Sequence, residues 1–163
     1  YLPGARPPAD SRAGRMETLG RKLDWPPNVW MGVSVETPKY LYRLDHLRRT
    51  PARVRFISFE PLLEALGELD LDDIHWAIVG GESGPGARPI EEAWVTEIRD
   101  QCVAVGVPFF FKQWGGTNKK KAGKLLEGRI WNEMPSPLPP APPKPTRRLP
   151  IARTCRCLPD AAP

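Results

Sequence analysis

The stretch Trp76-Ala77-Ile78-Val79-Gly80-Gly81-Glu82-Ser83 decides the fold. It opens with a short apolar run, typical of a strand in a parallel sheet, and it ends in a polar, glycine-rich turn. Three other segments repeat this order of an apolar run followed by polar residues: 29–36, 54–60 and 107–113. Because an α/β barrel builds its active site from residues at the carboxyl ends of separate strands, the repetition favours a barrel-like fold.

Helical patterns separate these four strands. Apolar residues recur at helical spacing over 11–23, 38–49 and 91–105, and Gly106 is the residue expected to end the last helix. The sequence therefore predicts an α/β fold with parallel strands. Four βα units are too few to close a barrel, so we expect a partial TIM-like (β/α) barrel, half of a complete one, with a small open sheet as the alternative.

Three regions divide the 163 residues. Residues 1–10 are expected to be a disordered end and residues 11–134 to form the barrel-like domain. Residues 135–163 are expected to be a disordered, basic, Pro-rich tail, because such a tail cannot bury enough apolar surface to offset its ordering entropy. The chain opens at Tyr1 rather than at Met, so we expect it to be a fragment of a longer protein. Half a barrel would leave two exposed sheet edges, and the fragment alone is therefore expected to be poorly stable.

The net charge of +5 is unevenly distributed. Residues 29–111 hold eight basic and thirteen acidic residues, whereas residues 112–163 hold eleven basic and three acidic ones. The basic runs at 119–121 and 147–148 could attract phosphate groups, although most such runs form a solvated surface. No apolar run approaches the roughly 20 residues that span a bilayer, which indicates a cytoplasmic protein without membrane contact.

Metal ligands are few in this chain. Cys155-Arg156-Cys157 has one intervening residue, where zinc and iron–sulfur sites usually have two or more. Neither His46 nor His75 has another ligand type at a recognised spacing. We therefore expect no metal site, and we expect Cys102 to be a small core residue.

Three carboxylates, Glu36, Glu60 and Glu82, follow apolar runs and form, with Lys112, the candidate catalytic residues. Carboxylates that share one barrel mouth can raise one another's pKa and act as general acid or base, or they can bind a cationic substrate group or a metal. A lysine there can bind an anion or, when desolvated, act as a base or Schiff-base nucleophile. In the structural alternative each charged group pairs with a neighbour or caps a helix.

The glycine-rich turn is the candidate site for a cofactor or an anion. Its glycines allow positive φ, its exposed N–H groups can form an anion-binding concavity, and an arginine could add a bidentate donor. The candidate binding residues are Gly80, Gly81, Ser83, Gly84, Gly86, Arg88 and Gln113. The alternative is a tight turn that only connects a strand to a helix. Trp114 could stack on a flat ligand, although packing is the commoner role.

Four ordered motifs carry a family resemblance. They begin with Trp25-Pro26-Pro27-Asn28 and Arg55-Phe56-Ile57-Ser58, continue with the stretch at 76–89, and end with Pro108-Phe109-Phe110-Phe111-Lys112-Gln113-Trp114-Gly115. Together with the segment at 128–135, they resemble the C-terminal half of the phage-type family named after gp thirty-seven and gp sixty-eight. The resemblance covers about residues 11–135.

The resemblance implies a radical-SAM-like barrel whose iron–sulfur cysteines lie in an N-terminal half that is absent here. Gly80-Gly81-Glu82 resembles the element by which radical-SAM enzymes hold the amino group of S-adenosylmethionine, but that element normally follows an early strand. The resemblance thus predicts a fragment that supplies the C-terminal strands and part of the substrate or cofactor mouth. We expect this fragment to hold no cofactor, to be inactive without the missing half, and to act there on a small molecule or a nucleic acid. The alternative function is a non-catalytic module that binds phosphate or nucleic acid through the glycine-rich turn and the basic tail.

Overall fold

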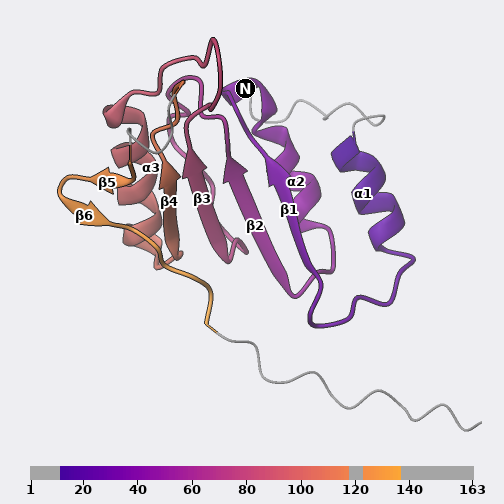
Figure 1. Ribbon diagram of the computed structural model, residues 1–163. Helices are drawn as coiled ribbons and strands as arrows, with labels where there is room; N and C mark the ends of the chain where they lie inside the picture. Colours follow the sequence, from indigo (N-terminus) through magenta and orange to yellow (C-terminus); the bar gives the residue numbers. More distant parts are fainter. Residues whose placement is uncertain (1–11, 118–122, 137–163) are drawn as a thin grey trace, which may run out of the picture.

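A computed structural model describes residues 12–117 and 123–136. Four strands form one sheet in the order β1-β2-β3-β4, and every neighbouring pair is parallel. These strands are β1 (Trp30–Ser34), β2 (Val54–Phe59), β3 (Trp76–Gly80) and β4 (Phe109–Gln113) (Figure 1). The prediction of an α/β fold with parallel strands is confirmed.

Helices cover one face of this sheet. The described helices are α1 (Arg12–Gly20), α2 (Tyr42–Arg48) and α3 (Glu92–Val105), with a short 3₁₀ helix, η1 (Pro38–Tyr40), before α2. In Figure 1, α2 and α3 lie behind the strands. Their apolar side chains meet every second residue of the strands in a single core, which includes Leu44, Leu47, Val95 and Ile98 from the helices and Val33, Ile57, Phe59, Ala77, Val79, Phe109 and Phe111 from the strands.

No described helix covers the other face of the sheet, which we call the open face. Side chains alternate between the two faces of a strand, so the residues between the core positions project from it. Most of them are half-buried, and Ser34 is exposed: Trp30, Ser34, Phe56, Ser58, Trp76, Ile78 and Phe110. Gly32 also belongs to this face, where the Phe56 ring covers it so closely that a Cβ would lie 2.3 Å from a ring carbon.

The two edges of the sheet differ. Residues 131–133 run antiparallel to the outer edge of β4, where the Phe111 N–H donates to the Trp131 carbonyl at 2.9 Å and the Glu133 N–H donates to the Phe109 carbonyl at 3.1 Å. At the other edge, no described strand pairs with the outer side of β1. The expectation of two exposed edges is therefore wrong for β4, because the chain folds back and covers that edge.

Several boundaries differ from the sequence-based prediction. The helix expected over 38–49 is divided into η1 and α2, and the strand expected from 107 begins at Phe109. The first helix ends at Gly20 rather than near 23. The prediction for Gly106 is confirmed, because it ends α3 in the left-handed conformation with φ of 73°.

Two further segments complete the described fold. Residues 61–71 form a loop in which four of the five leucines enter the core: Leu62, Leu66, Leu69 and Leu71. A two-stranded antiparallel hairpin, β5 (Leu125–Leu126) and β6 (Arg129–Ile130), had not been predicted. The expected disordered end at 1–10, the basic runs at 119–121 and 147–148 and the Pro-rich segment after 136 lie outside the described residues. Among the helices that are described, none is long and apolar enough to cross a membrane.

Candidate functional site

The candidate catalytic residues gather at the carboxyl ends of the strands, and the structure brings two of them into contact. Lys112 Nζ lies 2.8 Å from Glu60 Oε1 and 3.1 Å from Glu60 Oε2. Glu60 follows β2 and Lys112 belongs to β4, so their side chains meet across β3. Gly80 leaves room for this contact, because a Cβ at that position would lie 3.2 Å from Glu60 Oε1.

An irregularity in β4 contributes to this arrangement. Val79 pairs with Phe111, but Gly80 pairs with Gln113, so Lys112 is an extra residue in the ladder. Such bulges redirect a side chain and often occur beside active sites. The Lys112 side chain is 51% exposed and that of Glu60 is 22% exposed, so the ion pair is open to solvent on the lysine side.

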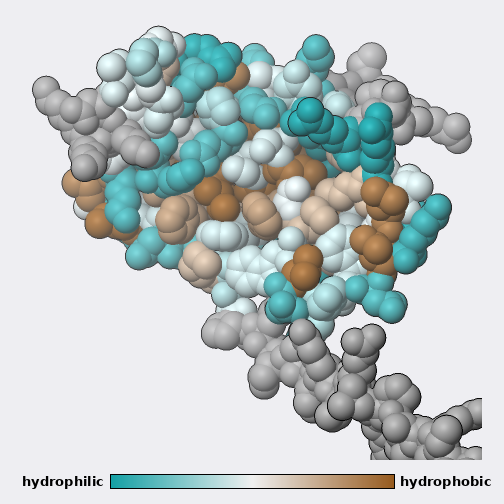
Figure 2. Space-filling view, turned by 45° about the vertical axis from the view of Figure 1, so that its right-hand side comes forward, coloured by the Kyte–Doolittle hydropathy of each residue, from teal (hydrophilic) through white to brown (hydrophobic). Residues whose placement is uncertain are grey.

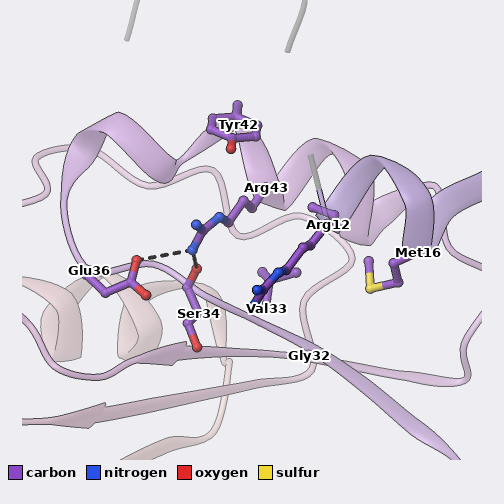
Figure 3. A pocket seen from close by; sticks show the side chains of 9 residues that line it. Arg12, Met16, Gly32, Val33, Ser34, Glu36, Tyr42 and Arg43 are labelled. Atoms are coloured by element: carbon purple, nitrogen blue, oxygen red, sulfur yellow. Dashed lines mark hydrogen bonds and ion pairs between the residues drawn. The ribbon is translucent and has the colours of Figure 1, made fainter. Parts of the chain in front are cut away.

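Glu36 has a different partner and lies between two pockets. Arg43 Nη1 lies 3.1 Å from Glu36 Oε2 and donates at 2.7 Å to the carbonyl oxygen of Ser34 (Figure 3). One pocket, of about 540 Å³, lies between α1 and β1, and the other, of about 450 Å³, extends toward Leu63 and Arg88. Both pockets include Glu36 and Arg43 in their walls.

Glu82 is bound by Arg88. The Arg88 guanidinium donates to both carboxylate oxygens at 2.8 and 3.0 Å, and the Arg88 backbone N–H donates at 2.9 Å. These side-chain and backbone hydrogen bonds lower the pKa of Glu82 to about 2. The prediction that the glutamates raise one another's pKa is therefore wrong for Glu82, which has its own basic partner, as the structural alternative for this residue stated.

The glycine-rich turn packs against the end of β4 and the loop that follows it, and its amides form hydrogen bonds there. The Gly81 N–H donates to the Gln113 carbonyl at 3.0 Å, the Gly84 N–H donates to the Gly116 carbonyl at 3.2 Å, and the Gly116 N–H donates to the Glu82 carbonyl at 2.7 Å. The Gln113 side chain donates to Ser83 Oγ at 2.6 Å. These backbone amides and the Arg88 side chain already have partners within the protein. The geometry therefore favours a turn that connects two parts of the chain rather than an anion-binding concavity.

The residues do not fit the S-adenosylmethionine site that the resemblance implies. Both oxygens of Glu82 bind Arg88, so this carboxylate is not free to hold the amino group of a cofactor. The described residues include no group of three or more His, Cys, Asp or Glu arranged to hold a metal ion. Cys102 is a core residue, as predicted, and burial raises the pKa of its thiol to about 12.

Aromatic side chains form the floor of the open face, and sequence reasoning missed them. Trp76 makes edge-to-face contact with Trp30 at 6.1 Å and with Phe110 at 5.9 Å between ring centroids, and a tilted contact with Phe56 at 5.9 Å. Trp114, by contrast, packs on Phe111 and donates to the Leu125 carbonyl at 2.8 Å. The aromatic floor and the Glu60–Lys112 pair thus share the open face of the sheet, and Trp114 lies outside it.

Comparison with known proteins gives one family. Residues 10–135 match the family described as "Protein of unknown function (DUF5131)". No curated protein and no solved structure matches the chain significantly. Since the matched region is well over half of the sequence, the chain belongs to the DUF5131 family.

Proposed function

We propose that this chain supplies one wall and part of the mouth of a substrate site in a partial α/β-barrel enzyme. The observation that carries the proposal is the open face, a parallel sheet surface with an aromatic floor and a charged pair at its carboxyl end. The family resemblance stated above points in the same direction, since it assigns the chain to the C-terminal half of a barrel.

The arrangement of the strands supports a barrel wall rather than a doubly wound sheet. Parallel sheets are normally covered on both faces. Here the strands follow their order in the chain, and the described helices that pack on the sheet share one face. A barrel shares these features, since its helices form the outer layer, its uncovered sheet face turns inward, and its chemistry lies at the carboxyl ends of the strands; the likeness supports the proposal.

The open face suits a small molecule that carries a flat ring and a charged group. Edge-to-face aromatic rings offer a large, rigid apolar contact surface. The Glu60–Lys112 pair lies at the end of this surface, and a ligand anion could take the place of Glu60 beside the exposed ammonium group. The alternative, a module that binds nucleic acid through the basic tail, stays a prediction, because the tail lies outside the described residues.

Tryptophan fluorescence can test the proposal, since Trp30 and Trp76 lie on the open face. The probes are adenosine 5′-monophosphate, which has a ring and an anion, adenosine, which has the ring alone, and inorganic phosphate. We expect the monophosphate to bind most tightly. Lys112→Met should raise its Kd about tenfold, equivalent to about 1.4 kcal/mol for one charged hydrogen bond, and leave adenosine binding unchanged.

The matched control is Lys124→Met, which removes an exposed lysine outside the open face. It should leave all three affinities unchanged. Equal effects of the two lysine substitutions, or no binding of any probe at about 1 mM, would contradict the proposal.

A further inference from the structure

We propose that a pocket at the carboxyl end of the sheet binds a small hydroxylated phosphate monoester, such as a polyol phosphate. We call it the rim pocket; it lies between η1, the start of α2, the loop after β2 and the glycine-rich turn, and its volume is about 450 Å³. Figure 2 shows mostly hydrophilic side chains along the upper rim of the molecule, where the strands of Figure 1 end. Neither Lys112 nor the aromatic floor is among the described residues that line the pocket, so the inference goes beyond the proposed function and does not rest on it.

Backbone hydrogen bonds fix the segments that form the walls of the rim pocket. The Leu63 N–H donates to the Glu36 carbonyl at 3.1 Å, and the Leu62 N–H donates to the Gly80 carbonyl at 3.0 Å. The loop after β2 is therefore tied both to the segment after β1 and to the end of β3. Because these segments are already ordered, a ligand that binds between them pays little of the usual entropic cost of ordering a loop.

Three basic side chains from separate segments line the rim pocket: Lys39, Arg43 and Arg88. Arg43 uses only Nη1 for its hydrogen bonds to Glu36 and to the Ser34 carbonyl. Arg88 uses Nε and Nη2 for Glu82. The remaining side-chain N–H groups of both arginines have no partner among the described residues, so these donors are available to a ligand.

The rim pocket also has an unbalanced positive charge. Arg43 is paired with a carboxylate and so is Arg88, whereas Lys39 has no acidic partner in the part of the chain that the structure describes. The Lys39 ammonium lies 5.8 Å from the centroid of the Tyr40 ring, and the Arg43 guanidinium lies 4.1 Å from the same centroid. Two positive charges therefore gather around one ring, and an anion beside them reduces their repulsion.

These donors suit a phosphate group. A phosphate monoester carries a charge of about −1.5 to −2 at neutral pH and offers three acceptor oxygens, and guanidinium and ammonium groups are its usual partners in proteins. Glu36 belongs to the same wall, and its Oε1 accepts no hydrogen bond from any described residue. This oxygen can accept a hydrogen bond from a ligand hydroxyl, which is why we infer a hydroxylated compound.

Isothermal titration calorimetry of the 163-residue chain can test the inference. The main probe is glycerol 3-phosphate, which has a phosphate and two hydroxyl groups but no ring that would bind the aromatic floor. The companion probes are inorganic phosphate and glycerol. We expect glycerol 3-phosphate to bind with a Kd below about 1 mM, inorganic phosphate to bind more weakly, and glycerol to show no binding in this range.

Lys39→Met is the decisive variant, because Lys39 is exposed and has no described ion pair whose loss would disturb the fold. It should raise the Kd of glycerol 3-phosphate about tenfold, whereas Lys39→Arg, which keeps the charge, should change it less than about threefold. The matched control is Lys124→Met, which should have no effect. Glu36→Gln removes a negative charge from the wall and should lower the Kd of inorganic phosphate about threefold.

Four results would overturn the inference: no binding of glycerol 3-phosphate at about 1 mM, equal effects of Lys39→Met and Lys124→Met, weaker phosphate binding by Glu36→Gln, or a loss of glycerol 3-phosphate affinity in Lys112→Met as large as that in Lys39→Met. The last result would mean that the phosphate binds at the open face. The nucleotide titration follows tryptophans of the open face, so failure of the rim-pocket inference and failure of the proposed function can be told apart.

Discussion

Replacing Gly81 by alanine should separate the glycine-rich turn from the loop that follows β4. A Cβ at this position would lie 2.0 Å from the carbonyl oxygen of Trp114 and 2.8 Å from its carbonyl carbon. Non-bonded heavy atoms prefer about 3.5 Å or more, and both of these neighbours belong to the backbone, which cannot rotate away like a side chain. The loop would therefore have to move by about 1 Å or more to relieve this contact.

The cost of this movement follows from the contacts that join the two loops. Three backbone hydrogen bonds connect them, from Gly81 to Gln113, from Gly84 to Gly116 and from Gly116 to Glu82. At about 1 kcal/mol net for each, their complete loss would cost about 3 kcal/mol. Overpacking typically costs about 1–3 kcal/mol, so we expect Gly81→Ala to lower the free energy of unfolding by about 2–3 kcal/mol.

Urea unfolding followed by tryptophan fluorescence would measure this effect. With a slope of about 1–3 kcal/mol per M, the midpoint should fall by about 0.7–3 M. The control is Gly80→Ala, whose Cβ would meet only the carboxylate end of Glu60 at 3.2 Å. That carboxylate can change rotamer, at a cost of about 1 kcal/mol. Equal midpoints for the two variants would refute the close backbone packing of the two loops.

Two further predictions concern the turn and the open face. The folded-state pKa of Glu82, about 2, lies below the ordinary value of 4.5, so its ionisation stabilises the fold above about pH 4.5 and this contribution is lost as the pH falls toward 2. The difference in urea midpoint between the unaltered chain and Glu82→Gln should therefore shrink over this range, and Arg88→Gln should show the same trend; a difference that does not depend on pH would contradict it. Gly32→Ala should destabilise the fold by about 1–3 kcal/mol, because its Cβ would lie 2.3 Å from the Phe56 ring. Adding Phe56→Leu should recover part of that loss in a double-mutant cycle, whereas additive losses would show that the two positions do not touch.

Local patterns were sufficient to predict some elements and insufficient for others. Short apolar runs and the glycine at position 106 are local signals, and they predicted the strands and the end of α3 within a few residues. The Glu60–Lys112 contact depends on the register of three strands and on the extra residue in β4. No spacing along the chain contains that information, so the pairing could be expected only as one option among several.

The aromatic floor illustrates the same limit. The apolar runs predict strands of a parallel sheet, which is normally covered on both faces. The register aligns Phe56 with Trp76 and Ile78 with Phe110, and only then do the aromatic residues of the open face separate from the core positions. The covered edge of β4 depends on residues 131–133, which carry no strand signal of their own.

The unequal edges limit how this sheet can be completed. A closed eight-stranded barrel needs a partner strand at β4 as well as at β1. Residues 131–133 already form backbone hydrogen bonds with Phe109 and Phe111. The centroid of the Trp131 ring lies 5.7 Å from that of the Phe109 ring, and the Arg129 guanidinium lies 4.0 Å from the centroid of the Trp131 ring. A new strand at β4 would have to break these contacts, whereas a strand at β1 would break no backbone hydrogen bond between described strands. In the partial barrel that we propose, a further strand would therefore be added at β1, and the sheet would stay open beside β4.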